Sequence, residues 1–188
     1  YSKFLTNDYI RAIYNGDQYG IPMQLINELG ANGSSPTIEE TDDYLALLLP
    51  HGIGDLIYWN DSANYQTSSK YSKSILMNQL WFGIREADCE FLPYWKNSDY
   101  VTVSPVSDRL VCSLYKRPGK VFLVIGNTTP KRQQVTIKLN KEKLGLPEKL
   151  VISPVNPEKV SEQNGVLTFE INGAQMGKNW QMMTVSGG

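Results

Sequence analysis

Carboxylate and aromatic side chains recur together in the first half of this chain, and such groups can bind or cleave carbohydrate. Hydrolysis of a glycosidic bond needs two carboxyl groups, or one carboxylate that assists an amide of the substrate. Aromatic rings offer flat apolar faces on which a sugar ring can stack, and the chain has 11 tyrosines and 4 tryptophans. The candidate sugar-binding residues are Asp17, Tyr19, Glu28, Trp59, Asp61 and Trp95.

Several of these candidates stand at the ends of short apolar runs. The runs end at Asn27-Glu28, at Asn60-Asp61 and at Tyr94-Trp95. In a parallel β/α sheet, active sites lie at the carboxyl ends of the strands, so we expect these points to share one edge. Asp17 lies apart from them, in a loop flanked by two glycines and two tyrosines. The simpler interpretation is that Asn60-Asp61 is a turn and that Asp17 is a solvated loop carboxylate.

The single histidine, His51, follows Pro50 at the end of a predicted helix. A protonated imidazole there would interact favourably with the helix C-terminus, whereas a catalytic role would use it as an acid or base. We favour the structural role, because no serine or cysteine nucleophile motif and no phosphate-binding glycine loop accompanies it. Cys89 and Cys112 form no metal motif, and the sequence leaves their pairing open. We expect no cofactor and no metal site.

Helix-like and strand-like segments alternate over residues 1–99. Thr37 and Glu40 fit a capping box at the start of a helix that stops at Pro50. The expected order is a helix from Thr6 to Asn15, a strand within 21–29, a helix over 37–49, a strand over 55–59, a helix from Ser68 or Ser69 to Ile84 and a strand over 91–95. This alternation predicts three β/α units with a parallel sheet. A complete (β/α) barrel takes about 250 residues, so these units form only part of one.

From residue 100 onward the pattern changes to short strands separated by turns. Residues 134–139 alternate between polar and apolar, as a half-buried strand does, and the apolar run 121–125 predicts a central strand. We expect a helical turn over 141–146 and a solvated hairpin tip at Lys116, Arg117 and Lys120. The expected strands cover 109–115, 121–125, 134–139, 149–153, 166–171 and 180–185. They predict an antiparallel β-sandwich over residues 100–188 that packs against the β/α region.

The overall composition is that of a globular protein with a real core. Hydrophobic residues make up 41% of the chain, charged residues 20%, and the formal net charge is -1. No basic excess favours nucleic acid as a partner, and no apolar run reaches the roughly 20 residues of a membrane helix. The chain begins with Tyr1 rather than methionine. We therefore expect a processed protein or a piece of a longer one.

Several stretches of the chain resemble a known family. The residues from CEFLPYW through VCSLYKRPGKVFLVIGNTTPKRQQVTIKLNKEKLGLP, together with YNGDQYGIP and ALLLPHGIG, resemble the C-terminal end of glycoside hydrolase 123-like proteins. The resemblance implies that the last units of a catalytic (β/α) barrel lead into a C-terminal β-sandwich. It also implies a carbohydrate substrate and a secreted or periplasmic location. The adjacent aspartate-glutamate pair of that family has no clear match, since Asp42-Asp43 lies on a predicted helix. We therefore assign no catalytic residue.

Three hypotheses of function follow from the sequence. In the first, the chain is the C-terminal portion of a glycoside hydrolase and is not catalytically complete by itself. In the second it is a non-catalytic carbohydrate-binding module, and in the third a purely structural domain whose partner is the remainder of its own protein. Three β/α units would leave open sheet edges, through which the chain could form a homodimer.

Overall fold

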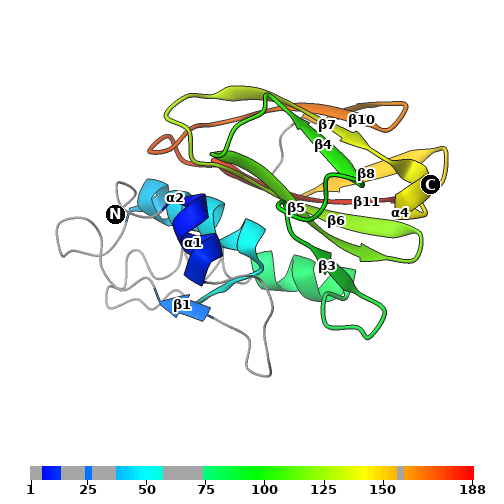
Figure 1. The fold of residues 1–188 in the computed structure, drawn as a ribbon, viewed down its shortest axis with the longest axis horizontal. Coiled ribbons are helices and arrows are strands. Elements are labelled where there is room, and N and C mark those ends of the chain that lie inside the picture. Colours follow the sequence, from blue (N-terminus) through cyan, green and yellow to red (C-terminus); the bar gives the residue numbers. More distant parts are fainter. Residues whose placement is uncertain (1–5, 14–23, 27–36, 57–73, 156–158) are drawn as a thin grey trace.

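The structure is a computed structural model that describes residues 6–13, 24–26, 37–56, 74–155 and 159–188. Two antiparallel sheets lie one upon the other, helices cover the outer face of one sheet, and a short parallel pair of strands lies beyond the helices (Figure 1). The fold is therefore mixed α/β, with mostly antiparallel strand pairing among the described residues.

The two antiparallel sheets hold most of the described strands. The four-stranded sheet has the order β4-β7-β10-β9 and the five-stranded sheet has the order β3-β5-β6-β11-β8. The strands of the first are β4 (Val101–Ser104), β7 (Gln133–Leu139), β9 (Ser161–Gln163) and β10 (Val166–Ile171). Those of the second are β3 (Glu90–Leu92), β5 (Leu110–Arg117), β6 (Lys120–Asn127), β8 (Leu150–Pro154) and β11 (Trp180–Gly187). A short helix, α4 (Lys141–Leu144), follows β7. The six strands and the helical turn expected after residue 100 are confirmed.

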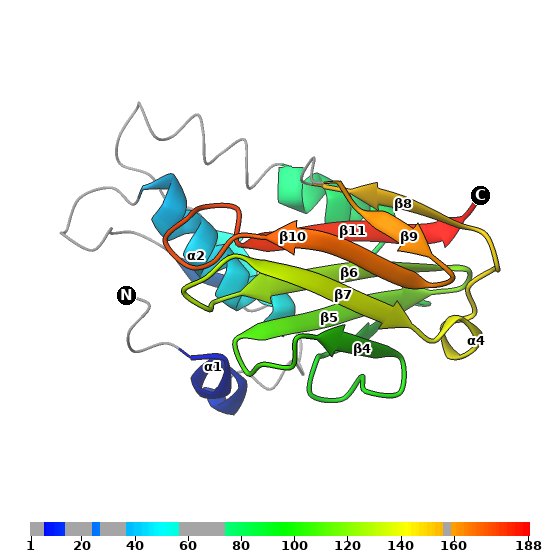
Figure 2. The same ribbon diagram turned by 90° about the horizontal axis from the view of Figure 1, so that it is seen from above.

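Strand β6 is buried on both faces, which explains its unbroken apolar run. Val121, Leu123 and Ile125 belong to a core that also contains apolar side chains of β7 and β10. Figure 2 shows β7 and β10 lying over the sheet that contains β6. Phe122 and Val124 belong instead to a second core, between the five-stranded sheet and the helices. All five side chains are fully buried. The central position predicted for this strand is therefore correct.

Helix α2 (Ile38–Leu48) begins with the capping box that the sequence predicts. The Thr37 side chain accepts a hydrogen bond from the Glu40 backbone N–H, and the Glu40 carboxylate accepts one from the Thr37 N–H. The helix leads into a 3₁₀ turn, η1 (Leu49–His51), which contains Pro50. Both the start and the end of this helix therefore follow from local sequence signals.

Helix α2 packs on the five-stranded sheet so closely that one strand residue has to be glycine. A Cβ atom on Gly126 of β6 would lie 1.9 Å from the carbonyl oxygen of Ala46 and 3.1 Å from Pro50. Leu45, Ala46 and Leu49 form the surrounding apolar contact. The backbone of the helix thus lies directly against the backbone of the strand.

The opposite side of α2 is covered as well. Leu47 and Leu48 are buried with Ile10 of helix α1 (Asn7–Ile13) and with Ile53. Strand β2 (Gly54–Leu56) follows Ile53 and pairs in parallel with β1 (Gln24–Ile26). The described fold therefore has a layer beyond α2, made of α1 and this parallel pair.

A second helical segment, residues 74–82, also packs on the five-stranded sheet. Two cationic side chains bind its C-terminal end: Arg117 Nη1 and Lys120 Nζ each donate a hydrogen bond to the carbonyl oxygen of Phe82 at 3.0 Å. Arg117 also donates to both carboxylate oxygens of Asp88, at 2.8 and 3.1 Å. The prediction of a merely solvated hairpin tip is therefore wrong, since these cations bind a helix C-terminus.

The strand predicted over 91–95 does not belong to the parallel sheet. Strand β3 ends at Leu92 and pairs antiparallel with β5, with Phe91 opposite Tyr115. The described parallel sheet consists of β1 and β2 alone, so a third parallel strand at this point is wrong. Strands β4 and β9 were not predicted: each is short, and β9 has only polar residues. The division into domains at residue 99 stays a prediction.

We predict that Gly126→Ala destabilises the protein by about 3 kcal/mol or more, because the added methyl group collides with backbone rather than with a movable side chain. Urea unfolding measures the change in the free energy of unfolding. The control is Gly119→Ala, whose methyl group would meet nothing within 4 Å. That variant should cost only the strain of the left-handed conformation, about 1–2 kcal/mol. Equal losses in the two variants would contradict the close packing of α2.

Candidate functional site

Only one of the six candidate sugar-binding residues lies within the described part of the chain. Asp17, Tyr19, Glu28, Trp59 and Asp61 lie outside the described residues. Trp95 is described, is half-buried and follows β3. It was placed at the end of a parallel strand, and that position is wrong because β3 is antiparallel to β5. Sugar binding by all six residues stays a prediction.

Trp95 belongs to a cluster of rings between α1, η1 and the five-stranded sheet. Its ring centroid lies 5.6 Å from that of His51 and 4.8 Å from that of Tyr94. The rings of His51 and Tyr94 meet edge to face at 5.4 Å. Trp95 and Tyr94 are each partly exposed, whereas His51 has no exposed surface. The cluster therefore offers two aromatic surfaces to a ligand but no access to the imidazole.

His51 makes hydrogen bonds through both ring nitrogens. Nδ1 lies 2.7 Å from the Leu47 carbonyl oxygen, and this short contact indicates an Nδ1–H that donates to it. Nε2 is then an acceptor, and it lies 3.3 Å from the Tyr94 hydroxyl, which can donate to it. The Asn7 carbonyl oxygen is 3.2 Å from Nε2, but this tautomer has no proton there to share with it. The imidazole thus joins the last turn of α2 to Tyr94, beside α1.

Burial keeps the groups of this cluster uncharged. Desolvation lowers the pKa of His51 below its ordinary 6.5, against the hydrogen bonds to Leu47 and Asn7, while the charge of Arg11 lowers it further. Desolvation also raises the pKa of Tyr94 to about 12. The lowered pKa disfavours the imidazolium, so His51 meets the end of α2 through its hydrogen bond to the Leu47 carbonyl rather than through a positive charge. The structural role favoured for His51 is supported in a different form, as a neutral hydrogen-bonding link.

The position of the cluster also favours a structural role. His51 precedes β2, and so lies at the amino end of that parallel strand. Enzymes of parallel β/α type carry their chemistry at the carboxyl ends, where the described residues stop at Ile26 and Leu56. The sequence analysis named Tyr94 at the end of an apolar run but connected neither Tyr94 nor Asn7 with His51. These residues are 43 and 44 positions from His51, so no local pattern links them to it.

The adjacent carboxylates Asp42 and Asp43 are fully engaged in holding the β10–β11 loop. Asp42 accepts hydrogen bonds from Trp180 Nε1 at 2.6 Å and from the Lys178 N–H at 2.7 Å. Asp43 accepts from the Gln175 N–H and from Asn179 Nδ2, both at 2.9 Å. Desolvation raises the pKa of both carboxyl groups, although these hydrogen bonds oppose it. Asp42 has no exposed surface, so the pair joins a helix to a loop and does not face a substrate.

A shallow hollow of about 510 Å³ lies over the β9–β10 hairpin. Its one carboxylate, Glu162, accepts a hydrogen bond from the Gly165 N–H at 2.8 Å. The other lining residues are Ser161, Gln163, Asn164, Val166 and Thr168. The hollow has neither a second carboxyl group nor an aromatic ring, so it lacks what glycoside hydrolysis requires.

Neither metal binding nor disulfide chemistry finds a site within the described part of the chain. No group of three or more histidine, cysteine, aspartate or glutamate side chains is placed there to hold a metal ion. Cys89 and Cys112 are both free thiols. Burial raises the pKa of both, to about 12 for Cys112. Of the described helices, none is both long and apolar enough to cross a bilayer.

Comparison with known proteins places the fold among glycoside hydrolases. No family model and no curated protein matches the sequence. A maltogenic α-amylase, AmyB from Thermotoga neapolitana, matches 98% of this chain with a TM-score of 0.52 and 12% identity. A glycoside hydrolase family 30 subfamily 8 xylanase, Xyn30A from Clostridium acetobutylicum, matches 89% of it with a TM-score of 0.50 and 15% identity. The chain spans 47% and 46% of these two proteins. At such identities the likeness concerns the fold alone.

We predict that His51 makes the folded protein less stable as the pH is lowered. As the pH falls from about 7.5 to 5.5, the unfolded chain binds a proton that the folded His51 resists, so the free energy of unfolding decreases. Asp42 and Asp43 act with the opposite sign, because the pKa of each is raised in the folded state. Urea unfolding at several pH values should show that His51→Asn removes the decrease. A variant with the unchanged pH profile would show that His51 titrates normally.

We predict that Asp42→Ala lowers the free energy of unfolding by about 2–4 kcal/mol, because it removes the buried carboxylate that accepts hydrogen bonds from the Trp180 indole N–H and the Lys178 N–H. Chemical denaturation followed by fluorescence measures the loss. Glu39→Ala is the matched control, on an exposed position of the same helix, and should cost no more than about 1 kcal/mol. An Asp42 variant as stable as the control would show that the helix is held without this carboxylate.

Proposed function

We propose that this chain is the C-terminal portion of a glycoside hydrolase and that it is not catalytically complete by itself. In this proposal the β/α region supplies the last units of a catalytic barrel, and the two antiparallel sheets are the C-terminal β-sandwich that supports them. Both glycoside hydrolase matches support it, because each covers nearly all of this chain and less than half of the hydrolase.

The observation that carries the proposal is the position of α2 between two layers. One side of the helix lies against Gly126 and Phe122 of the five-stranded sheet, and the other side lies against Ile10 and Ile53. Strands β1 and β2 have three residues each. Parallel strands of this kind occur in larger sheets that are covered on both faces. The parallel pair is therefore understood best as one edge of a larger β/α structure that rests on the β-sandwich.

The two carboxylate sites described above agree with an incomplete active site. Both carboxylate oxygens of Asp42 and of Asp43 accept hydrogen bonds from the β10–β11 loop or β11, and Glu162 stands alone in its hollow. We propose that the catalytic carboxylates belong to polypeptide outside this chain, and that Asp17, Tyr19, Glu28, Trp59, Asp61 and Trp95 contribute at most to sugar binding. A specific relationship to glycoside hydrolase 123-like proteins and a secreted or periplasmic location belong to the same proposal.

A second candidate function is non-catalytic carbohydrate binding. The partly exposed rings of Tyr94 and Trp95 favour it, since they form a surface on which a sugar can stack. The outer face of the four-stranded sheet gives no such support. The one aromatic residue of its strands, Phe169, points into the core.

We predict that the chain alone releases no sugar from starch, xylan or an N-acetylhexosaminide, because Asp42 and Asp43 bind the β10–β11 loop and Glu162 has no second carboxyl group in its hollow. The measurement is reducing-sugar release, combined with binding of the same glycans by calorimetry. If binding occurs without release, Trp95→Ala should weaken it at least tenfold, and Trp81→Ala, which removes an exposed tryptophan outside the cluster, should leave it unchanged. Release of sugar by the chain alone would overturn the proposal of an incomplete site.

A further inference from the structure

The 74–82 helix is apolar on the face that points away from the protein. Ile75 and Phe82 are buried against the five-stranded sheet, 6% and 3% exposed. Leu76, Leu80 and Trp81 are 45%, 40% and 72% exposed. At about 3.6 residues per turn these three lie together on the side opposite the sheet. A helix that is apolar on both sides normally has both sides covered.

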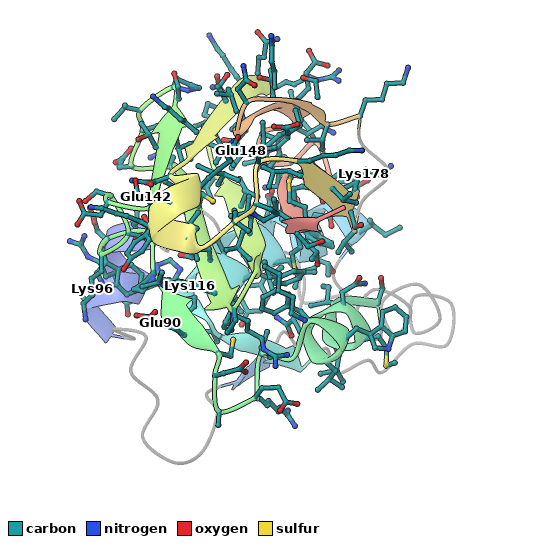
Figure 3. All side chains as sticks on the ribbon, turned by 90° about the vertical axis from the view of Figure 1, so that its right-hand side faces the viewer. Glu90, Lys96, Lys116, Glu142, Glu148 and Lys178 are labelled. Atoms are coloured by element: carbon teal, nitrogen blue, oxygen red, sulfur yellow. The ribbon has the colours of Figure 1, made fainter. Side chains whose placement is uncertain are left out.

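The exposed face also lacks the charges that a solvated helix carries. The segment reads SILMNQLWF and contains no charged residue. Elsewhere charged side chains lie at the surface. Glu90 and Lys116 are an example, where β3 pairs with β5 (Figure 3), and the Lys116 Nζ atom lies 4.0 Å from Glu90 Oε2. Neighbouring exposed apolar side chains of this size mark an interaction surface rather than a solvent-facing one.

Helix α2 shows how the outer side of a helix that packs on the five-stranded sheet is covered. It packs on the same sheet through Leu45 and Ala46, as the 74–82 helix does through Ile75 and Phe82. Its other side is buried under α1 and the residues leading into β2. The same kind of layer, continued sideways, would cover Leu76, Leu80 and Trp81.

We propose that the outer face of the 74–82 helix is a docking surface for further β/α polypeptide that lies outside these 188 residues. The occupant is an uncharged, apolar β/α segment that continues the parallel sheet of β1 and β2. The inference rests on the proposed function, because it takes the chain to be one part of a larger hydrolase. Its support is that the 74–82 helix and α2 pack in one apolar cluster on the same sheet, that α2 is covered on its other side, and that the 74–82 helix carries no charge.

The test places Trp81→Lys and Leu80→Lys, separately, in this chain and in the complete polypeptide that its gene encodes. Lysine is a good helix former, so the helix itself should tolerate it. The matched control is Val151→Lys, at a position 43% exposed on β8. In the chain alone, we expect all three variants to keep the urea midpoint of the parent and to remain monomeric by light scattering. In the complete polypeptide, we expect the two helix variants to lower the melting temperature by several degrees, and the control to leave it unchanged.

Other results would assign the outer face of the 74–82 helix to a different partner, or to no partner. Unfolding of the 188-residue chain by Trp81→Lys would show that this chain covers the face itself. A dimer that Trp81→Lys separates would assign the face to a second copy. Both results overturn the inference, as does a complete polypeptide whose helix variants melt like the control. A destabilised complete polypeptide that releases no sugar even before mutation would instead support the docking surface and refute the proposed hydrolase. A gene that encodes no further β/α polypeptide would refute both.

Discussion

The close contact between α2 and the five-stranded sheet is the constraint on which the other layers depend. Gly126 removes the one side chain that would separate the backbone of the helix from that of β6. Asp42 then fixes the helix along the sheet through the Trp180 indole. With α2 held in this way, α1 and the residues before β2 pack on its far side. The β/α part and the two antiparallel sheets are thus joined by a shared helix rather than by a linker.

Buried polar groups in this protein serve mainly to connect layers. Ser113 of β5 donates to the Pro50 carbonyl and accepts from the Tyr94 N–H, so it joins η1 to the segment after β3. Asn97 donates to the carbonyl oxygens of Leu92 and Cys112 in the same region. A buried polar group needs a partner to offset its desolvation. Such groups therefore define how the layers are positioned, which apolar packing alone leaves less specific.

Local signals in the sequence predicted the elements well, and long-range pairing was predicted less well. The capping box at Thr37 and the alternation in β7 depend on neighbours in the chain, and both are confirmed. The run 91–95 was assigned to the wrong sheet, because an apolar strand reads the same whether its partner is parallel or antiparallel. The roles of Arg117 and Asp42 depend on residues 35 and 138 positions away. No local pattern could have revealed them. The same holds for His51, whose neutral state follows from burial between elements.

The position of β11 has a consequence for the order in which the protein can assemble during synthesis. This strand is the last of the described strands to leave the ribosome, yet it lies inside the five-stranded sheet, between β6 and the edge strand β8. It also carries Trp180, the partner of Asp42. Until β11 has emerged, β6 and β8 have no strand between them and α2 lacks its main polar anchor. The complete five-stranded sheet and the bond between Asp42 and Trp180 can therefore form only after β11 has been synthesised.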